Sequence, residues 1–276
     1  MTLALYDSST GTKRPYSPGQ HDGVECVPPA GVSAALADVR QAVITNLVAR
    51  LTGTARHDDA SLARLLTAAT DHAFEPEAVR YWALSLHYRD AGEGTAADAD
   101  PRAACETRVT ELAATAQRLR TLPAERIVPV QTAPASTLAG FPSSLRGRLE
   151  DDLDTPRALL ALDGFLSAVN ALCDTALSKK GQVNASAIAA AEVGFEASEA
   201  LLGLGFARPE AFLRRVRDRR ARERNIDRAD VEARIARRAA LRAAKDFTAA
   251  DQLQDELLAL GVRLHDGPAG TSWTLV

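Results

Sequence analysis

The densest group of chemically active side chains is a basic block from Arg214 to Lys245. It contains 13 Arg or Lys against 5 Asp or Glu, a local charge of about +8 in a chain whose net charge is −3. Guanidinium groups at this density suit phosphate contacts, which predicts a nucleic-acid or acidic-partner surface. Within the block, Arg219, Arg220 and Arg222 are the candidates for phosphate contacts.

The same block has a second interpretation that the charges alone leave open. It can be an exposed, Arg-rich helix whose charges pair with acids one turn away. The acids available for such pairs are Glu223, Asp227, Asp230 and Glu232.

The segment 237–273 predicts the small domain that positions these charges. Its beginning is rich in Ala, Arg and Leu and has no Gly or Pro, which favours a helix. Asp246 precedes an apolar-periodic run and is typical of the N-cap of a second helix. Gly261 is placed as the glycine that follows a helix end. Residues 262–264 and 271–274 then predict two short strands joined by a turn-rich loop.

This segment resembles the C-terminal anticodon-binding domain of cysteinyl-tRNA synthetases. In that family, a helix carrying R-x-x-K-D-[FW]-x-x-A-D is followed by a second helix, then G-[IV]-x-L-x-D and G-x-x-W. Each part occurs here in the same order, at Arg242, Lys245-Asp246-Phe247, Ala250-Asp251, Gly261-Val262, Leu264, Asp266, Gly270 and Trp273.

The resemblance implies that Arg242, Asp251 and Asp266 hydrogen-bond the anticodon bases. Carboxylates can accept from base amino groups, and an Arg guanidinium can donate to a base edge or stack on it. Phe247 holds a position often occupied by Trp in the family, and Trp273 is either part of the domain core or a stacking platform. The alternative is that Asp251 is a solvated helix acid and Asp266 a turn acid.

The first 60 residues resemble pieces of the same family's catalytic domain. Short extended pieces in 3–18, a strand at Val24–Val27 and a helix over Val32–Leu51 are expected. Cys26 matches a cysteine that supplies one zinc ligand in the family, but the two histidines of the ATP-binding tetrad have no counterpart near 34–37. One ligand does not make a structural zinc site, so no metal and no cofactor is expected.

Only about 25 residues separate Leu51 from Pro76, where the family places most of its nucleotide-binding fold. Residues 76–89 resemble the start of the family's helical domain, whose Asp-Ala-Leu-Arg motif is Glu-Ala-Val-Arg here. A single βαβ unit needs on the order of 30 residues. We therefore expect the ATP and cysteine active site to be missing, and no catalytic residue is predicted.

Helices are expected over most of the remaining chain. Residues 100–122 are amphipathic, 123–142 read as a connector, and helices resume at Ser144. The acidic run before Pro156 resembles a family turn in which Thr155 caps the helix that continues to Leu177. Its carboxylates are expected to complement the positive helix N-terminus rather than to bind metal.

The predicted fold is mainly α, in three parts. Residues 1–60 would be a β/α remnant of the catalytic domain, 61–205 a helical bundle of the family's type, and 206–276 the basic helix and the small α/β domain. No signal-peptide pattern follows Met1 and no apolar run approaches about 20 residues. We expect a cytoplasmic protein without a membrane or DNA partner.

The expected function is tRNA binding without aminoacylation, with the cysteine isoacceptor as partner and a separate enzyme acting on the bound tRNA. Two alternatives belong to other classes. One is an enzyme, or enzyme subunit, of a tRNA-dependent transfer in secondary metabolism. The other is a protein-interaction scaffold whose basic helix docks an acidic partner.

Overall fold

The structure is a computed structural model that describes residues 3–7, 10–17, 24–28, 33–54, 59–70, 73–90, 100–129, 133–267 and 270–275. These residues are mainly helical, with a helical bundle and a small α/β part, which confirms the predicted fold class. The chain divides into two compact units, Met1–Glu210 and Ala211–Val276.

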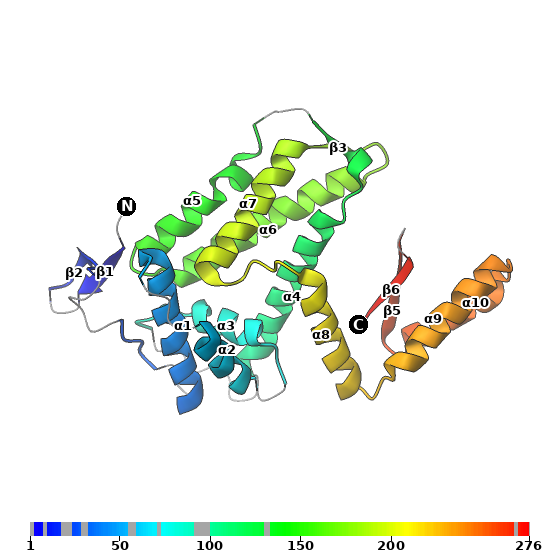
Figure 1. Cartoon of the computed structure of the whole chain (residues 1–276), viewed down its shortest axis with the longest axis horizontal. Helices are drawn as coiled ribbons and strands as arrows, with labels where there is room; N and C mark the ends of the chain where they lie inside the picture. Colours follow the sequence, from blue (N-terminus) through cyan, green and yellow to red (C-terminus); the bar gives the residue numbers. More distant parts are fainter. Residues whose placement is uncertain are drawn as a thin grey trace. The chain divides into compact units, whose positions relative to one another are not determined.

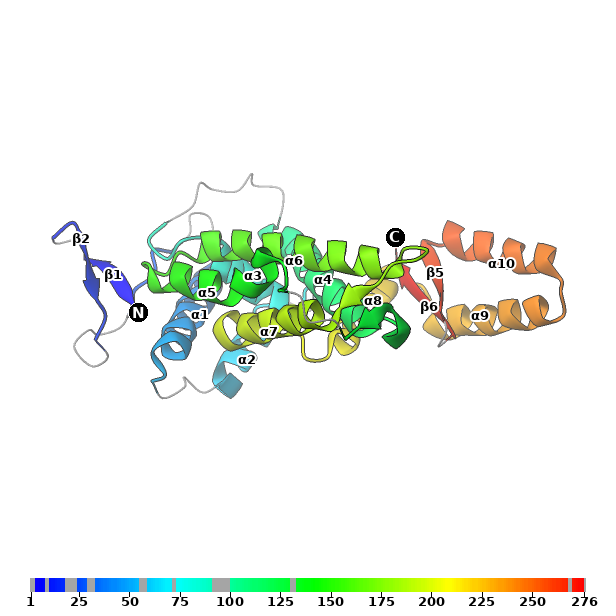
Figure 2. The ribbon, with the colours of Figure 1, turned by 90° about the horizontal axis from the view of Figure 1, so that it is seen from above.

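Within the described residues, the first unit contains seven α-helices and a short 3-10 helix, Ala124–Arg126 (Figure 1). In both ribbon views α5, α6 and α7 lie side by side (Figure 2). Three aromatic rings join them: the Phe165 ring stacks on that of Phe141, with centroids 4.3 Å apart, and meets that of Phe195 edge to face, with centroids 5.2 Å apart. The helices are α1 (Ala34–Thr52), α2 (Asp59–Ala68), α3 (Pro76–Ser85), α4 (Pro101–Arg120), α5 (Ser136–Glu150), α6 (Thr155–Leu177) and α7 (Ala185–Leu202).

A short hairpin, β1 (Ala4–Asp7) and β2 (Thr12–Pro15), is anchored to the turn between α5 and α6. The anchor is Asp152, whose Oδ1 accepts from the Tyr6 N–H at 2.8 Å and from the Tyr88 hydroxyl at 2.7 Å. Asp152 is buried and left-handed, with φ 64°. Asp152 thus binds the hairpin rather than the helix N-terminus, whereas Asp154 of the same acidic run complements the N-terminus of α6, as expected. Two further strands, β3 (Ile127–Val128) and β4 (Val183–Asn184), pair in parallel.

The predicted strand at Val24–Val27 is not formed; residues 24–28 carry no secondary structure. Their backbone groups pair instead with side chains of α1 and, at the Val27 N–H, with the Tyr88 carbonyl at 2.8 Å. Gln41 donates to the Val24 carbonyl at 2.6 Å and accepts from the Cys26 N–H at 2.8 Å. The buried Arg40 guanidinium donates to the Val27 carbonyl.

Two predictions around α5 and α6 were wrong in detail. The connector ends earlier than expected, because α5 begins at Ser136 and contains Pro142. Leu138, Phe141 and Leu145 are buried at helical spacing, so packing offsets the hydrogen bond that proline removes. The cap of α6 is Asp154, which accepts from the Arg157 N–H at 3.2 Å, and Thr155 is the first helical residue.

By length and composition, helix α6 is long and apolar enough to cross a membrane, and it carries Asp163 and Asp174 within its length. In the structure its residues Leu162, Phe165 and Val169 are buried in the helical bundle.

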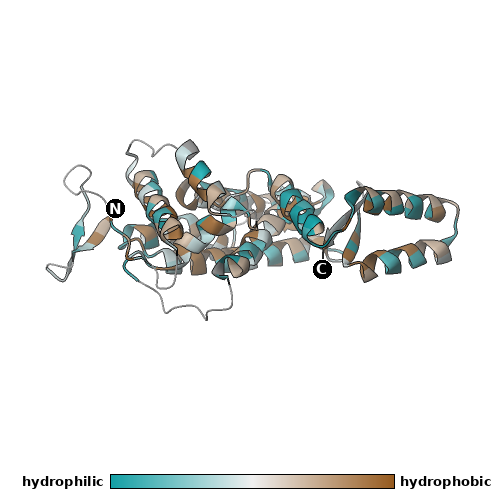
Figure 3. Ribbon diagram, turned by 90° about the horizontal axis from the view of Figure 1, so that it is seen from below, coloured by the Kyte–Doolittle hydropathy of each residue, from teal (hydrophilic) through white to brown (hydrophobic). Residues whose placement is uncertain are grey.

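The second unit consists of most of α8 (Pro209–Glu223), with α9 (Arg228–Ala243), α10 (Phe247–Ala259), β5 (Val262–Gly267) and β6 (Gly270–Leu275). Hydrophilic and hydrophobic residues alternate along α9 and α10 (Figure 3), as in amphipathic helices. Asp246 caps α10 by accepting from the Ala249 N–H at 3.1 Å, and Gly261 follows its end with φ 80°. The cap, the glycine and the antiparallel hairpin confirm the predicted elements.

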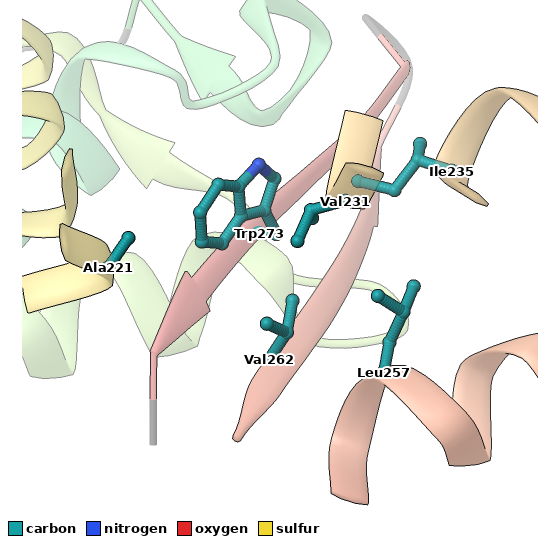
Figure 4. Packing of buried hydrophobic residues seen from close by; sticks show 6 residues of the cluster. All are labelled: Ala221, Val231, Ile235, Leu257, Val262 and Trp273. Carbon is teal, nitrogen blue, oxygen red and sulfur yellow. The ribbon is translucent and has the colours of Figure 1, made fainter. Parts of the chain in front are cut away.

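The core of this unit joins all of its elements through apolar side chains. Trp273 of β6 lies at its centre, with Val262 of β5 beside it (Figure 4). The cluster consists of Ala221, Val231, Ile235, Leu257, Val262 and Trp273. This core fixes the hairpin against α9 and α10.

Candidate nucleic-acid interface

Asp266, near the end of β5, is the centre of a hydrogen-bonded ion-pair network. Arg238 donates to both of its carboxylate oxygens, at 2.9 and 3.0 Å, and Arg242 donates to Oδ2 at 3.0 Å. The Thr271 hydroxyl donates to Oδ1 at 2.7 Å. The Arg238 and Thr271 hydrogen bonds hold the pKa of the Asp266 carboxyl well below its usual range, so this group stays ionised.

This network gives Asp266 a role that the sequence did not predict. A carboxylate has about four acceptor positions, and four N–H or O–H groups of the protein already donate to Asp266. A base amino group would have to displace one of them. As it stands, Asp266 orients the guanidinium groups around it.

Arg238 is a member of the candidate site that sequence reasoning missed. Its guanidinium is buried and also donates to Gln254 Oε1 at 2.8 Å, so it links α9, α10 and β5. The available signal was its position four residues before Arg242, which places both side chains on one helix face. The partners themselves lie 28 and 16 residues away, beyond any local pattern.

Phe247 and Asp251 lie on the first turns of α10, four residues apart and therefore on one side of the helix. Phe247 is 57% exposed, which leaves its ring available for stacking. Asp251 is exposed as well. Arg242, at the end of α9, has half of its side chain exposed.

Trp273 is a core residue. It is only 3% exposed, its Nε1 donates to Glu232 at 3.1 Å, and the Arg217 guanidinium lies 4.4 Å from its ring centre. Two roles were predicted for this ring, core residue and stacking platform, and its burial agrees with the core role. A base cannot stack on it while it is buried there.

The basic block is largely ion-paired within the second unit. Pairs join Arg219 to Glu223 at 2.6 Å, Arg228 to Glu232 at 3.9 Å and Arg234 to Asp230 at 2.8 Å, all one helical turn apart. Asp227 does not pair in this way; it caps α9 by accepting from the Ala229 N–H at 2.8 Å. The paired-helix interpretation thus describes much of the block.

The three arginines predicted to contact phosphate differ in exposure. Arg219 is buried, Arg220 is partly buried, and Arg222 is exposed with its Nε donating to the Asp218 carbonyl at 3.3 Å. Arg237 and Lys245 are also exposed. Of the three, Arg222 is therefore the best placed to reach a phosphate.

Cys26, the residue that matches a family zinc ligand, has a free thiol. Burial raises its pKa to about 11, against a smaller lowering effect of the nearby Arg40. In the described part of the chain, no group of three or more His, Cys, Asp or Glu side chains is arranged to hold a metal ion.

Comparison with known proteins finds relatives that are named cysteine–tRNA ligase. That of Anaeromyxobacter dehalogenans (strain 2CP-1) is 38% identical over 203 residues, covering 72% of this chain and 39% of the relative. Those of Nitratidesulfovibrio vulgaris (Hildenborough) and Geobacter sulfurreducens are 31% and 29% identical, each covering 73% of this chain and 41% of the relative. No protein-family model matches. The chain thus has a cysteinyl-tRNA synthetase-like relationship and spans about two fifths of the length of these relatives.

Proposed function

We propose that this cysteine–tRNA ligase-like chain binds tRNA, recognises the cysteine isoacceptor through its anticodon, and does not aminoacylate it. The observation that supports the proposal is that four residues matched to the family's anticodon motif lie in one folded unit, where Arg242 and Asp266 are in contact. Arg242 donates to Asp266 at 3.0 Å, and the exposed Phe247 and Asp251 begin the next helix.

Each side chain has a distinct role in this proposal. The outer N–H groups of Arg242 donate to a base, the Phe247 ring stacks on one, and the Asp251 carboxylate accepts from a base amino group. Asp266 and the buried Trp273 position these groups. Arg222, assisted by Arg220, contacts phosphates without reading sequence, whereas the burial of Arg219 favours a structural role.

The absence of aminoacylation is supported by what lies between α1 and α3. Residues 53–75 fill this interval, and the 10-residue α2 is the described element within it. A nucleotide-binding βαβ unit needs on the order of 30 residues. In this proposal the chain binds cytoplasmic tRNA and presents it to a separate enzyme.

Two measurements test the proposal. The full chain should bind a tRNA-Cys anticodon stem–loop with the GCA anticodon more tightly than the same stem–loop with a substituted anticodon. Equal affinity for both would mean that the matched residues do not read bases. In the second measurement, cysteine-dependent exchange of pyrophosphate into ATP should not rise above a control without enzyme; exchange above that control would contradict the non-catalytic part.

A further inference from the structure

We propose that Gln254, held by Arg238, is a specificity-determining residue that donates to a base and selects guanine over adenine. This inference rests on the proposed RNA-binding function and deepens it. Gln254 is absent from the family motif matched in the sequence, and its role follows from the hydrogen bonds around it.

The orientation of the Gln254 amide is set by chemistry. A guanidinium has donors and no acceptor, so the Gln254 atom 2.8 Å from Arg238 Nη2 must be the amide oxygen. Arg238 cannot rotate freely to another arrangement, because it is buried and forks onto both carboxylate oxygens of Asp266. The amide nitrogen therefore faces away from Arg238.

Arg238, Asp266, Arg242 and Gln254 form a polar cluster, and the groups that this polar cluster exposes to solvent are hydrogen-bond donors. Gln254 is exposed, and within the described residues no protein group accepts from its Nε2. Arg242 uses Nη1 for Asp266, which leaves further N–H groups on a half-exposed side chain. Asp266, the acceptor of the cluster, is occupied by four protein donors.

An outward pair of donors distinguishes the purines. A Gln with both amide atoms available pairs with adenine by donating to N7 and accepting from N6. Here the amide oxygen is committed to Arg238, so the adenine amino group meets no acceptor. Guanine presents N7 and O6, both acceptors, and an Arg side chain commonly donates to these two atoms. The arrangement thus favours guanine and disfavours adenine at one anticodon position.

The test compares Gln254→Glu with Gln252→Glu in the full chain. The carboxylate that Gln254→Glu introduces would keep the same side-chain length and one oxygen on Arg238, but its outer oxygen cannot donate. Gln252 is exposed on the same helix, so its substitution adds the same charge without touching Arg238. The probes are GCA stem–loops that carry guanosine, 7-deazaguanosine, inosine or adenosine at the guanosine position.

For the unmutated chain, 7-deazaguanosine should weaken binding about tenfold, as loss of one base contact does, whereas inosine, which keeps N7 and O6, should bind like guanosine. Gln254→Glu should lose a similar factor on guanosine and show no further loss on 7-deazaguanosine, while Gln252→Glu keeps the full discrimination. A chain that prefers GCA but responds to neither 7-deazaguanosine nor Gln254→Glu would overturn this inference alone. A chain that prefers no anticodon at all would overturn the proposed function.

Discussion

Asp251 allows the cleanest single-residue test of anticodon reading. Its carboxylate is exposed on α10, so Asp251→Ala should change the free energy of unfolding by less than about 0.5 kcal/mol. A base contact of this kind contributes about 1–3 kcal/mol of discrimination, and the preference for a GCA stem–loop should fall by that amount. Asp255→Ala, one turn further along the same exposed face, is the matched control. Equal effects of the two substitutions in a binding titration would assign the loss to general charge.

Asp266 predicts a pH dependence whose direction follows from its network. The pKa of this carboxyl is lowered in the folded state, first by the Arg238 hydrogen bond and then by that of Thr271, while an unfolded Asp titrates near pH 3.9. The ionised Asp266 carboxylate therefore stabilises the folded state above about pH 4, and this stabilisation is lost as the pH falls towards the pKa of the folded state.

Asp266→Asn should accordingly destabilise the protein by about 1 kcal/mol at pH 7, a modest figure because the side chain is half exposed. The difference in the free energy of unfolding between Asp266→Asn and the unmutated chain should shrink as the pH falls from about 4 to about 2. Denaturant titrations at several pH values measure this. A difference that stays constant over that window would assign the effect to packing rather than to charge.

At the scale of elements, the sequence predicted several structures that local signals decide, although the cap of α6, also a local feature, was assigned to Thr155 and is Asp154. Three such predictions were confirmed: the helix cap at Asp246, the glycine after the helix end at Gly261, and the hairpin of the two strand segments. Each depends on residues that are close in the sequence. Further failures occurred where a distant partner decides the role of a side chain. Asp152 binds Tyr6, which lies 146 residues away, and Arg238 binds Asp266, 28 residues away. Periodicity and capping rules relate residues only a few positions apart, so they cannot predict pairs at this separation.

Gly194 in α7 is an element-scale prediction that rests on packing. A Cβ at this position would lie 2.3 Å from the Phe165 ring and 3.2 Å from Phe141, two of the rings that join α5, α6 and α7. Gly194→Ala should lower the stability by about 1–3 kcal/mol, measured by thermal or denaturant unfolding. Gly164→Ala is the control, since its Cβ meets no atom within 4 Å and Ala is the better helix former. Stabilisation by both substitutions would mean that the Phe165 and Phe141 rings move aside at little cost in free energy.

At the scale of the whole molecule, the uneven charge determines how RNA binding should respond to salt. The chain carries −3 overall, yet about +8 lies between Arg214 and Lys245. Much of that positive charge is used in ion pairs such as Arg219–Glu223. The number of phosphates contacted should therefore be well below the number of arginines. The slope of log affinity against log salt concentration measures this number, because each phosphate contact contributes about 0.7–0.9 to its magnitude.

Arg222→Ala should weaken binding to all tRNAs alike, because Arg222 is exposed. It should also reduce the magnitude of the salt slope by about 0.7–0.9, the contribution of one phosphate contact. The preference for the GCA anticodon should not change, since phosphate contacts carry no sequence information. Arg219→Ala should instead lower the stability, because it removes a buried guanidinium and leaves Glu223 unpaired. Lys180→Ala, an exposed cation of the first unit, serves as the charge control. Binding titrations at several salt concentrations decide between the two interpretations of the block: a slope that Arg222→Ala leaves unchanged would mean that the basic helix is a paired, solvated face rather than an RNA contact.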